Sequence, residues 1–303
     1  MIPRIGITLG DPAGIGPEIA AKAIADPRVR AACEAILYGP ADLSAFPAGQ
    51  LSADAGRAAY DAIASAVGDA LAGRLSAVVT CPVNKEAFAL AGLPWRGHTD
   101  LLAHLAGSEF VAMMFHSPRL SVVLATVHVA LREVPALLTR PLIERVVRLT
   151  ARELPRILGR AGQVGEFAPA PQPARVRLAV AGLNPHAGEH GLMGEEDERV
   201  LRPTIEALAA DGIDVRGPFP ADTVFVRAMA GEFDAVVACY HDQGLIPVKM
   251  AAFGTAVNVT LGLPIIRTSV DHGTAFDIAG RGVADPGSLI AAILLAAKLA
   301  AHP

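Results

Sequence analysis

Three histidines follow predicted strands at widely separated points of the chain, and each opens a loop that contains glycine or proline. They are His128, His186 and His241. Because the carboxyl ends of parallel strands meet at one edge of a sheet, we expect the three imidazoles to converge there. Three imidazoles with open positions for water or substrate form a catalytic zinc site, and Glu189 and Asp242 could orient two of the rings. A hydrogen-bonded loop position remains the alternative for each histidine taken singly.

Three polar side chains surround the next predicted strand. Lys249, Asn258 and Arg267 could together hold a carboxylate or phosphate, which Arg binds bidentately. A divalent cation close to Lys249 would lower the pKa of its amine, which could then serve as an acid or base. The alternative for each residue is a solvated polar group beside a strand.

The segment Gly97-His98-Thr99-Asp100 precedes a predicted helix. His98 and Thr99 could donate hydrogen bonds to an anion at the amino terminus of that helix. The alternative is that Thr99 only caps the helix and His98 lies on the surface.

Two loops are rich in glycine. The first, residues 10–18 (GDPAGIGPE), lacks the GxGxxG fingerprint of dinucleotide-binding folds and suits either a tight turn or a ligand loop. The second, residues 271–286 (DHGTAFDIAGRGVADP), combines glycines with a histidine and three acids, which a purely structural loop would not need. We therefore expect the second loop to bind a ligand.

Short apolar runs alternate with helical patterns, which predicts an α/β fold with a largely parallel sheet. The predicted strands cover residues 5–9, 77–80, 110–115, 120–126, 176–181, 235–239 and 256–260. The predicted helices lie near residues 17–25, 84–92, 99–106, 141–158, 195–210 and 286–301. Surface loops are expected at Pro40–Gly56 and at Gly162–Pro173, where the second is a candidate insertion.

The composition narrows the class of protein. The 303 residues are 52% hydrophobic and carry a net charge of -4, without a basic stretch for nucleic acid or anionic membrane. The first ten residues lack the charged, apolar and cleavage regions of a signal peptide, and Cys33, Cys81 and Cys239 form no CxxC motif. We expect a soluble cytoplasmic protein that acts on a small molecule.

Residues 271–286 resemble the cofactor loop of isopropylmalate and isocitrate dehydrogenases. This resemblance implies that NAD or NADP is bound, with His272, Gly273, Thr274 and Asp277 in contact with it. It also implies two α/β/α domains with a cleft between them. The N- and C-terminal segments, 1–127 plus 267–303, would form the first domain, and residues 128–266 the second.

Seven motifs in the same order resemble the 4-hydroxythreonine-4-phosphate dehydrogenase family over almost the whole chain. They are GDPAGIGPE, PVNKEA, GHTD, the strand before His128, LNPHAGE, YHDQGLIPVK and the block VNVTLGLPIIRTSVDHGTAFDIAG. The resemblance implies that the three histidines bind one divalent metal, zinc, cobalt or magnesium. It assigns substrate contacts to His98, Thr99, Lys249, Asn258 and Arg267.

The implied reaction is oxidation of the C3 alcohol of 4-phosphooxy-L-threonine by NAD(P)+, followed by decarboxylation to 3-amino-2-oxopropyl phosphate in pyridoxal phosphate synthesis. Lys249 is the expected proton acceptor, and the resemblance suggests a homodimer with its active site at the subunit interface. Asp100 and Cys81 depart from the family pattern, and the loop at 162–173 is longer. Related enzymes act on four-carbon sugar-acid phosphates or aromatic cis-dihydrodiols, so those substrates remain open. An alternative of another class is a metal- or nucleotide-binding protein without turnover.

Overall fold

The computed structural model describes residues 2–160 and 175–301. The chain divides into two compact units, a terminal unit of residues 1–111 with 254–303 and a central unit of residues 112–253. The domain bounds expected from the sequence, at 127/128 and 266/267, stay a prediction. The compact units are defined by their internal contacts, which is not the same as a division into domains. The predicted insertion at Gly162–Pro173 lies outside the described residues.

Five strands form the sheet of the terminal unit in the order β2-β1-β3-β10-β9. They are β1 (Arg4–Thr8), β2 (Glu34–Tyr38), β3 (Ala77–Thr80), β9 (Val257–Leu261) and β10 (Arg267–Ser269). β1 pairs in parallel with β2 and β3, β10 is parallel to β3, and β9 is antiparallel to β10. Thr8 pairs with Thr80, and Thr80 with Ser269, so three parallel strands end in register.

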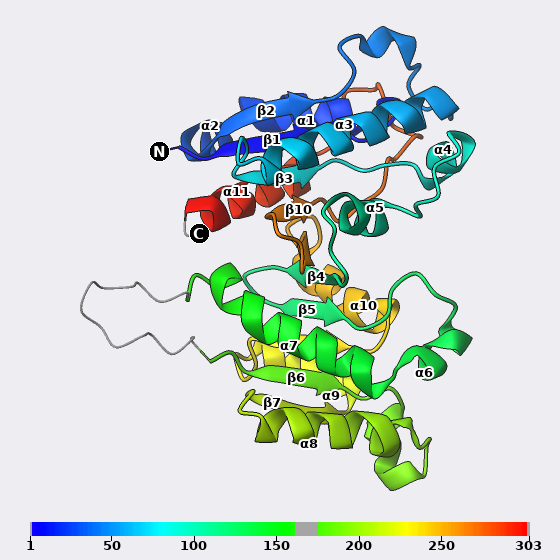
Figure 1. The fold of residues 1–303 in the computed structure, drawn as a ribbon, viewed down its shortest axis with the longest axis vertical. Helices are drawn as coiled ribbons and strands as arrows, with labels where there is room; N and C mark the ends of the chain where they lie inside the picture. The colour runs from blue at the N-terminus through cyan, green and yellow to red at the C-terminus, as the bar shows by residue number, and fades with distance from the viewer. Residues whose placement is uncertain (1, 161–174, 302–303) are drawn as a thin grey trace, which may run out of the picture. The chain divides into compact units, whose positions relative to one another are not determined.

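The helices of the terminal unit form two groups with strands between them (Figure 1). One group is α1 (Gly16–Ala25), α2 (Pro27–Ala32) and α11 (Gly287–Ala301); the other is α3 (Ala53–Leu71), α4 (Lys85–Leu90) and α5 (His98–Leu105). In the second group Ile63 of α3 packs in one buried cluster with Phe88 of α4 and Leu101 and Leu102 of α5. Burying each such side chain contributes roughly 1.5–3 kcal/mol. This cluster fixes the helix whose first residue is His98.

The central unit has the strand order β4-β5-β8-β6-β7. Its strands are β4 (Ala112–His116), β5 (Ser121–Leu124), β6 (Leu178–Ala181), β7 (Val215–Phe219) and β8 (Ala235–Ala238). β4 and β5 are antiparallel, whereas β8 is parallel to β5 and to β6, and β6 is parallel to β7. The helices are α6 (Val134–Leu137), α7 (Arg140–Ile157), α8 (Arg202–Ala210), α9 (Ala221–Met229) and α10 (His241–Ala252).

The α/β class expected from the sequence is confirmed, and each predicted strand and helix has a counterpart within a few residues. Three strands (β2, β7 and β10) and several helices, among them α3 and α10, were not predicted. The predicted loop at Pro40–Gly56 is wrong at its end, because α3 begins at Ala53. The hydroxyl of Ser52 caps that helix by accepting a hydrogen bond of 3.1 Å from the amide of Ala55.

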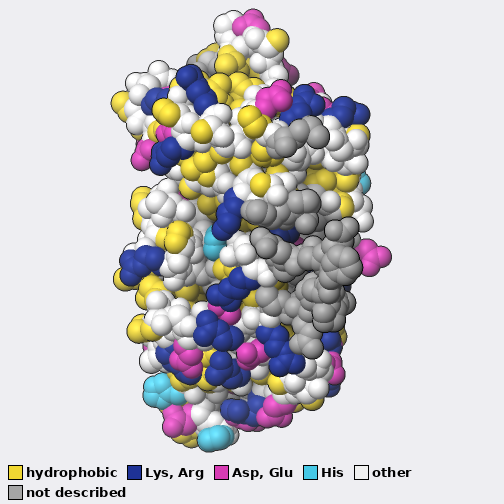
Figure 2. Space-filling model, turned by 90° about the vertical axis from the view of Figure 1, so that its left-hand side faces the viewer, with side chains coloured by type: hydrophobic (Ala, Val, Ile, Leu, Met, Phe, Trp, Pro, Cys, Tyr) yellow, Lys and Arg dark blue, Asp and Glu magenta, His cyan; other side chains and the backbone are white. Residues whose placement is uncertain are grey.

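The surface carries both signs of charge. Lys and Arg are interspersed with Asp and Glu on the face drawn in Figure 2, and ion pairs such as Arg202 with Glu198 join the two kinds. Cys33, Cys81 and Cys239 are buried and free. Among the described residues, no helix is long and apolar enough to cross a membrane.

Two glycines of α3 should respond to alanine in opposite directions. A Cβ atom on Gly56 would lie 2.2 Å from the carbonyl oxygen of Ala87 in α4, whereas a Cβ atom on Gly68 would meet nothing within 4 Å. Gly56→Ala should therefore lower the free energy of unfolding by about 1–3 kcal/mol through overpacking. Gly68→Ala should raise it by roughly 0.5–1 kcal/mol through helix propensity. Urea denaturation measures both, and a stabilised Gly56→Ala variant would contradict the close α3–α4 contact.

Candidate active site

The three predicted metal ligands follow three neighbouring strands of the central unit. His128 comes after β5, His186 comes after β6, and His241 follows β8 by three residues as the first residue of α10. These strands are mutually parallel and adjacent in the order β5-β8-β6. Their carboxyl ends therefore share one edge of the sheet, as the sequence predicted.

Two of the three histidines lie side by side. The ring centroids of His128 and His241 are 5.6 Å apart, with the rings tilted by 42°. Both rings line a cavity of about 260 Å³, together with Tyr240 and the apolar side chains of Val129 and Leu131. The cavity thus offers two imidazoles against a partly apolar wall.

Carboxylates orient two of the imidazoles. The Nδ1 atom of His241 lies 2.7 Å from Oδ1 of Asp242, and that of His186 lies 2.8 Å from Oε2 of Glu189. A carboxylate only accepts hydrogen bonds, so each Nδ1 carries the hydrogen and leaves Nε2 with its lone pair. This is the arrangement in which histidine serves as a metal ligand, and both carboxylates are the ones expected from the sequence.

The turn that carries His186 has an unusual backbone. Residues 186–190 all have positive φ, from 43° to 78°, and only one of them is glycine. Each non-glycine residue in this left-handed region costs about 1–2 kcal/mol. The His128 backbone is left-handed as well, with φ of 41°. Strained residues of this kind cluster at functional sites, where surrounding structure holds them in place.

A buried carboxylate holds the entrance to the His186 turn. Asp197 is 0% exposed and accepts hydrogen bonds from the amides of Leu183 (2.8 Å) and Asn184 (3.1 Å) and from the side-chain amide of Asn184 (2.9 Å). Asp197 begins a short π-helical turn, Asp197–Leu201, which precedes α8. Such turns are frequent at functional sites. Asp197 could not be singled out from the sequence, because it stands among other acids in a helical segment.

Two further side chains tie the strand ends to one another. Gln243 accepts a hydrogen bond from the amide of Cys239 (2.7 Å) and donates one to the carbonyl of Gly182 (2.7 Å), which joins the end of β8 to the end of β6. The hydroxyl of Thr126 donates to the carbonyl of Cys239 at 2.8 Å and joins the ends of β5 and β8. These residues, which sequence reasoning also missed, fix the spacing of the three histidine loops.

The structure does not gather all of the predicted central residues. In the described part of the chain, no three His, Cys, Asp or Glu side chains come together as a group that could hold a metal ion. His186 is therefore not assembled with the His128–His241 pair. Lys249 is exposed and lies eight residues after His241 in α10, which places its Cα about 12 Å further along the helix. The three-ligand site and the acid–base role of Lys249 stay predictions.

The other predicted substrate residues belong to the terminal unit, where Arg267 is the largest fully buried side chain. Its side chain is 2% exposed, and its guanidinium donates to the hydroxyls of Thr260 (2.9 Å) and Thr80 (2.6 Å). Burial lowers the pKa of Arg267 to about 9, so the group is still charged at neutral pH. Within the described residues its hydrogen bonds go only to hydroxyls, and a buried cation is costly unless an anion pairs with it. The predicted role of Arg267 in binding a phosphate or carboxylate stays a prediction.

Two predicted neighbours also have buried polar atoms without a hydrogen-bond partner. The atoms without a partner are Nε2 of His98 and Oδ1 of Asn258. Nε of Arg267 is a third such atom. Burial and the positive charge of Arg267 lower the pKa of His98 well below its usual 6.5, so its ring is neutral near pH 7. Buried polar groups in native proteins are normally satisfied, so these atoms have hydrogen-bonding capacity left for a polar ligand.

Thr99 is the second residue of α5 and does not cap it. The cap position is Gly97, with no side-chain hydrogen bond, and Asp100 instead accepts from the amide of Arg96 in the preceding turn. The first amides of this helix are therefore open to an anion. The simple capping role that the sequence left open for Thr99 is not observed.

The loop of residues 271–285 is held at both ends and exposed in the middle. Asp271 exchanges hydrogen bonds with the hydroxyl of Ser288, at 2.9 Å and 3.3 Å. Gly273 and Asp277 are exposed, and His272 and Thr274 partly so. The residues predicted to contact the cofactor thus lie on an accessible part of a tethered loop.

The first glycine-rich loop supports the 271–285 loop. The amide of Ile15 donates to the carbonyl of Thr274 at 3.0 Å, and a Cβ atom on Gly14 would lie 3.0 Å from the same carbonyl oxygen. Asp11 accepts from the amide of Ala13 through Oδ1, while its buried Oδ2 has no hydrogen-bond partner. Burial raises the pKa of Asp11. The loop is therefore at least a structural turn on which the second loop rests.

Comparison with known proteins gives full-length matches. The family model of the pyridoxal phosphate biosynthetic protein PdxA matches residues 17–296. The chain is 45% identical over 339 residues to a 4-hydroxythreonine-4-phosphate dehydrogenase of Desulfosudis oleivorans, with 99% of this chain and 96% of that protein covered. It is 42% identical over 340 residues to a D-threonate 4-phosphate dehydrogenase of Cupriavidus necator, with 99% and 98% covered.

Solved structures agree with these matches. The 4-hydroxythreonine-4-phosphate dehydrogenase of Klebsiella pneumoniae has a TM-score of 0.83 at 39% identity, with 98% of this chain and 99% of that chain covered. A terephthalate 1,2-cis-dihydrodiol dehydrogenase of Burkholderia xenovorans has a TM-score of 0.67 at 30% identity, covering 98% of each chain. A β-decarboxylating dehydrogenase of Thermococcus kodakarensis shares the fold, with a TM-score of 0.54 at 17% identity over 97% of this chain and 81% of that one.

Arg267→Met should separate anion binding from folding. Met keeps much of the apolar volume and removes a buried charge, so the melting temperature of the ligand-free protein should stay the same or rise. Inorganic phosphate should stabilise the wild type by about 2.7 kcal/mol at a hundred times its Kd, and the variant not at all. Thermal unfolding with and without phosphate measures both effects.

The matched control is Arg74→Met, which removes an exposed arginine paired with Asp69. This control should keep the phosphate-dependent shift. A phosphate shift that persists in Arg267→Met would show that Arg267 is not the anion site.

Proposed function

Because the chain belongs to the PdxA family of pyridoxal phosphate biosynthetic proteins, we propose that it is an NAD(P)-dependent dehydrogenase of 4-phosphooxy-L-threonine. The C3 alcohol would lose a hydride to the nicotinamide and a proton to a base. The resulting 3-oxo acid would lose CO2 and give 3-amino-2-oxopropyl phosphate.

The buried charge of Arg267 is the observation that carries this proposal. A guanidinium that is 2% exposed, and that hydrogen-bonds only to hydroxyls in the described part of the chain, favours a substrate with an anionic group. In our proposal Arg267, Asn258 and the neutral His98 bind this group, together with Thr99 and the open amides of α5. Thr80 and Thr260 hold the guanidinium plane, which suits the bidentate geometry of phosphate or carboxylate.

The histidines of the central unit supply the second element of the proposal. Their donor chemistry fits a divalent cation such as zinc or cobalt better than magnesium, which prefers oxygen ligands. Carboxylates occupy Nδ1 of His186 and His241 and leave Nε2 available. A cation bound there would polarise the substrate alcohol and favour its deprotonation. Binding by all three histidines requires His186 to approach the His128–His241 pair. Lys249, on the same helix as His241, is the proposed proton acceptor.

We also propose that the enzyme is a homodimer with its active site at the subunit interface. Ile246, Met250 and Phe253 are 59%, 84% and 80% exposed and follow one another at helical spacing along α10 and its end. This apolar stripe lies on the helix that carries His241 and Lys249, which is consistent with a second copy next to the site. A monomer in light scattering at assay concentration would contradict the dimer.

A different anionic alcohol is the second candidate substrate. The chain is similar to a D-threonate 4-phosphate dehydrogenase and to a terephthalate 1,2-cis-dihydrodiol dehydrogenase. A sugar-acid phosphate or an aromatic dihydrodiol carboxylate is therefore the alternative substrate. Both have the anionic group that Arg267 requires. Binding of metal and nucleotide without turnover is the candidate of another class.

A substrate panel tests the proposal directly. We expect NAD(P)H to form, detected by its absorbance, with 4-phosphooxy-L-threonine, and turnover to stop when a chelator removes the metal. Turnover of only D-threonate 4-phosphate or only the dihydrodiol would transfer the assignment to the second candidate. Cofactor binding without turnover of any of the three would support the non-catalytic reading, and chelator-insensitive turnover would refute the metal role.

His186→Ala should abolish stoichiometric binding of zinc without unfolding the protein, because the side chain is 61% exposed. Metal analysis after dialysis measures the stoichiometry, and circular dichroism checks the fold. His190→Ala is the matched control in the same turn, since the His190 side chain is 91% exposed and is not a proposed ligand. Full zinc retention in His186→Ala would contradict its place in the site.

A further inference from the structure

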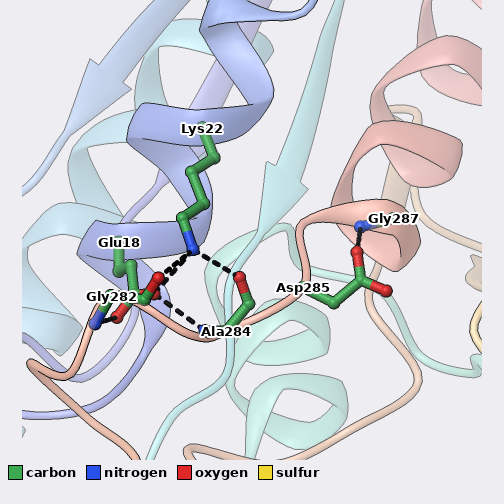
Figure 3. A network of polar contacts seen from close by, with 6 residues as sticks. All are labelled: Glu18, Lys22, Gly282, Ala284, Asp285 and Gly287. Atoms are coloured by element: carbon green, nitrogen blue, oxygen red, sulfur yellow. Dashed lines mark hydrogen bonds and ion pairs between the residues drawn. The ribbon is translucent and has the colours of Figure 1, made fainter.

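An ion pair on helix α1 contacts a segment that is far away in the sequence. Glu18 and Lys22 are one helical turn apart, and Nζ of Lys22 lies 2.8 Å from Oε1 of Glu18. Figure 3 shows that both side chains point at the backbone of residues 282–284, the last part of the 271–285 loop. The pair is more buried than an ordinary surface ion pair, with 15% of the Glu18 side chain and 36% of the Lys22 side chain exposed.

This ion pair satisfies every backbone polar group of two residues. Lys22 donates to the carbonyls of Gly282 (2.9 Å) and Ala284 (2.7 Å). Glu18 accepts from the amides of Gly282 (3.2 Å) and Ala284 (2.8 Å). A neighbouring strand would normally supply such partners to alternate residues. Here two charged side chains do so, and we call the four residues the loop clip.

The chemistry of the clip suits lysine and glutamate specifically. An ammonium group has three donors, and Lys22 uses them on Glu18, Gly282 and Ala284. The planar guanidinium of arginine could not direct its donors in this way. Hydrogen bonds to charged groups are about twice as strong as neutral ones. Lys22, above all, lowers the pKa of Glu18, which keeps the carboxylate ionised.

The clip fixes the C-terminal part of the 271–285 loop, which other hydrogen bonds also anchor. Just after it, Asp285 accepts from the amide of Gly287 at the start of α11, at 2.8 Å (Figure 3). At the opposite end Asp271 is bonded to Ser288. Between these anchors Gly273 and Asp277 are exposed. Loss of the clip would free the exit of the loop and leave its entrance in place.

We propose that Glu18 and Lys22 are positioning residues for the dinucleotide. They do not touch it, but they hold the 271–285 loop in its binding conformation before the cofactor arrives. Pre-ordering of a loop increases affinity, because less conformational entropy is lost on binding. This inference rests on the proposed function, in which the loop binds NAD(P).

The test compares Lys22→Met, Glu18→Gln and the double variant with wild type. Each single change should raise the Kd for NADH and the KM for NAD(P)+ about tenfold, with kcat at saturating cofactor within about twofold of wild type. The Kd of the double variant for NADH should not exceed the higher of the two single-variant values, since the two residues act as one unit. Lys22→Arg should give an intermediate Kd.

Hydrogen exchange supplies a readout that does not depend on the cofactor. The amides of Gly282 and Ala284 should exchange faster in both single variants, while amides in β1 stay protected. Arg28→Met is the matched control, because Arg28 pairs with Asp26 on exposed surface at the start of α2. This control should match wild type in every measurement.

The outcomes distinguish failure of the loop clip, failure of the positioning role and failure of the proposed function. Faster exchange of the two amides with unchanged NADH affinity would overturn the positioning role. Unchanged exchange would overturn the clip itself. If the wild type bound neither NADH nor NADPH, the proposed function would fail and the positioning role with it, whereas the exchange data would still report on the clip.

Discussion

Parallel strand pairing in register is the constraint on which the candidate sites of both units depend. In the terminal unit Thr8, Thr80 and Ser269 end three adjacent parallel strands side by side, and the loops that follow include both glycine-rich segments. In the central unit β5, β8 and β6 repeat this arrangement with the three histidine loops. A backbone hydrogen-bond pattern, independent of any functional side chain, thus determines which distant segments can meet.

Strain and its compensation shape the histidine loops. The left-handed turn at 186–190 would not persist in an isolated peptide, since each non-glycine residue in it is disfavoured. Asp197 and Gln243 offset this cost with hydrogen bonds to backbone groups at the loop entrance. Asp197 and Gln243 make these hydrogen bonds inside the protein. The histidine rings that they help to place lie at the surface or line a cavity. Rigidity and reactivity are therefore assigned to different residues.

The sequence predicted what depends on local pattern. Buried strands are continuous apolar runs, and the candidate ligands stand out because histidine and glycine follow them. Helix α10 was missed because Gly244 and Pro247 interrupt its pattern, and β10 because it has three residues. The partners of Arg267 lie far away in the sequence. Asp197 anchors a loop because its side chain turns inward from an otherwise polar helical segment. No periodicity records such contacts, so they could be found only in three dimensions.

In the proposed anion site, the desolvated guanidinium of Arg267 would also exclude ligands that lack a charge. A neutral alcohol that took the place of an anionic ligand would leave a buried cation unmatched, and the penalty of an unpaired buried charge is about 3–5 kcal/mol. Since each 1.4 kcal/mol is a factor of ten in affinity, uncharged sugars and diols would be excluded by two to three orders of magnitude or more. Discrimination of this kind needs no steric gate. In the proposed site it would arise from leaving a buried cation without a counter-charge, so that one residue would provide both recognition and rejection.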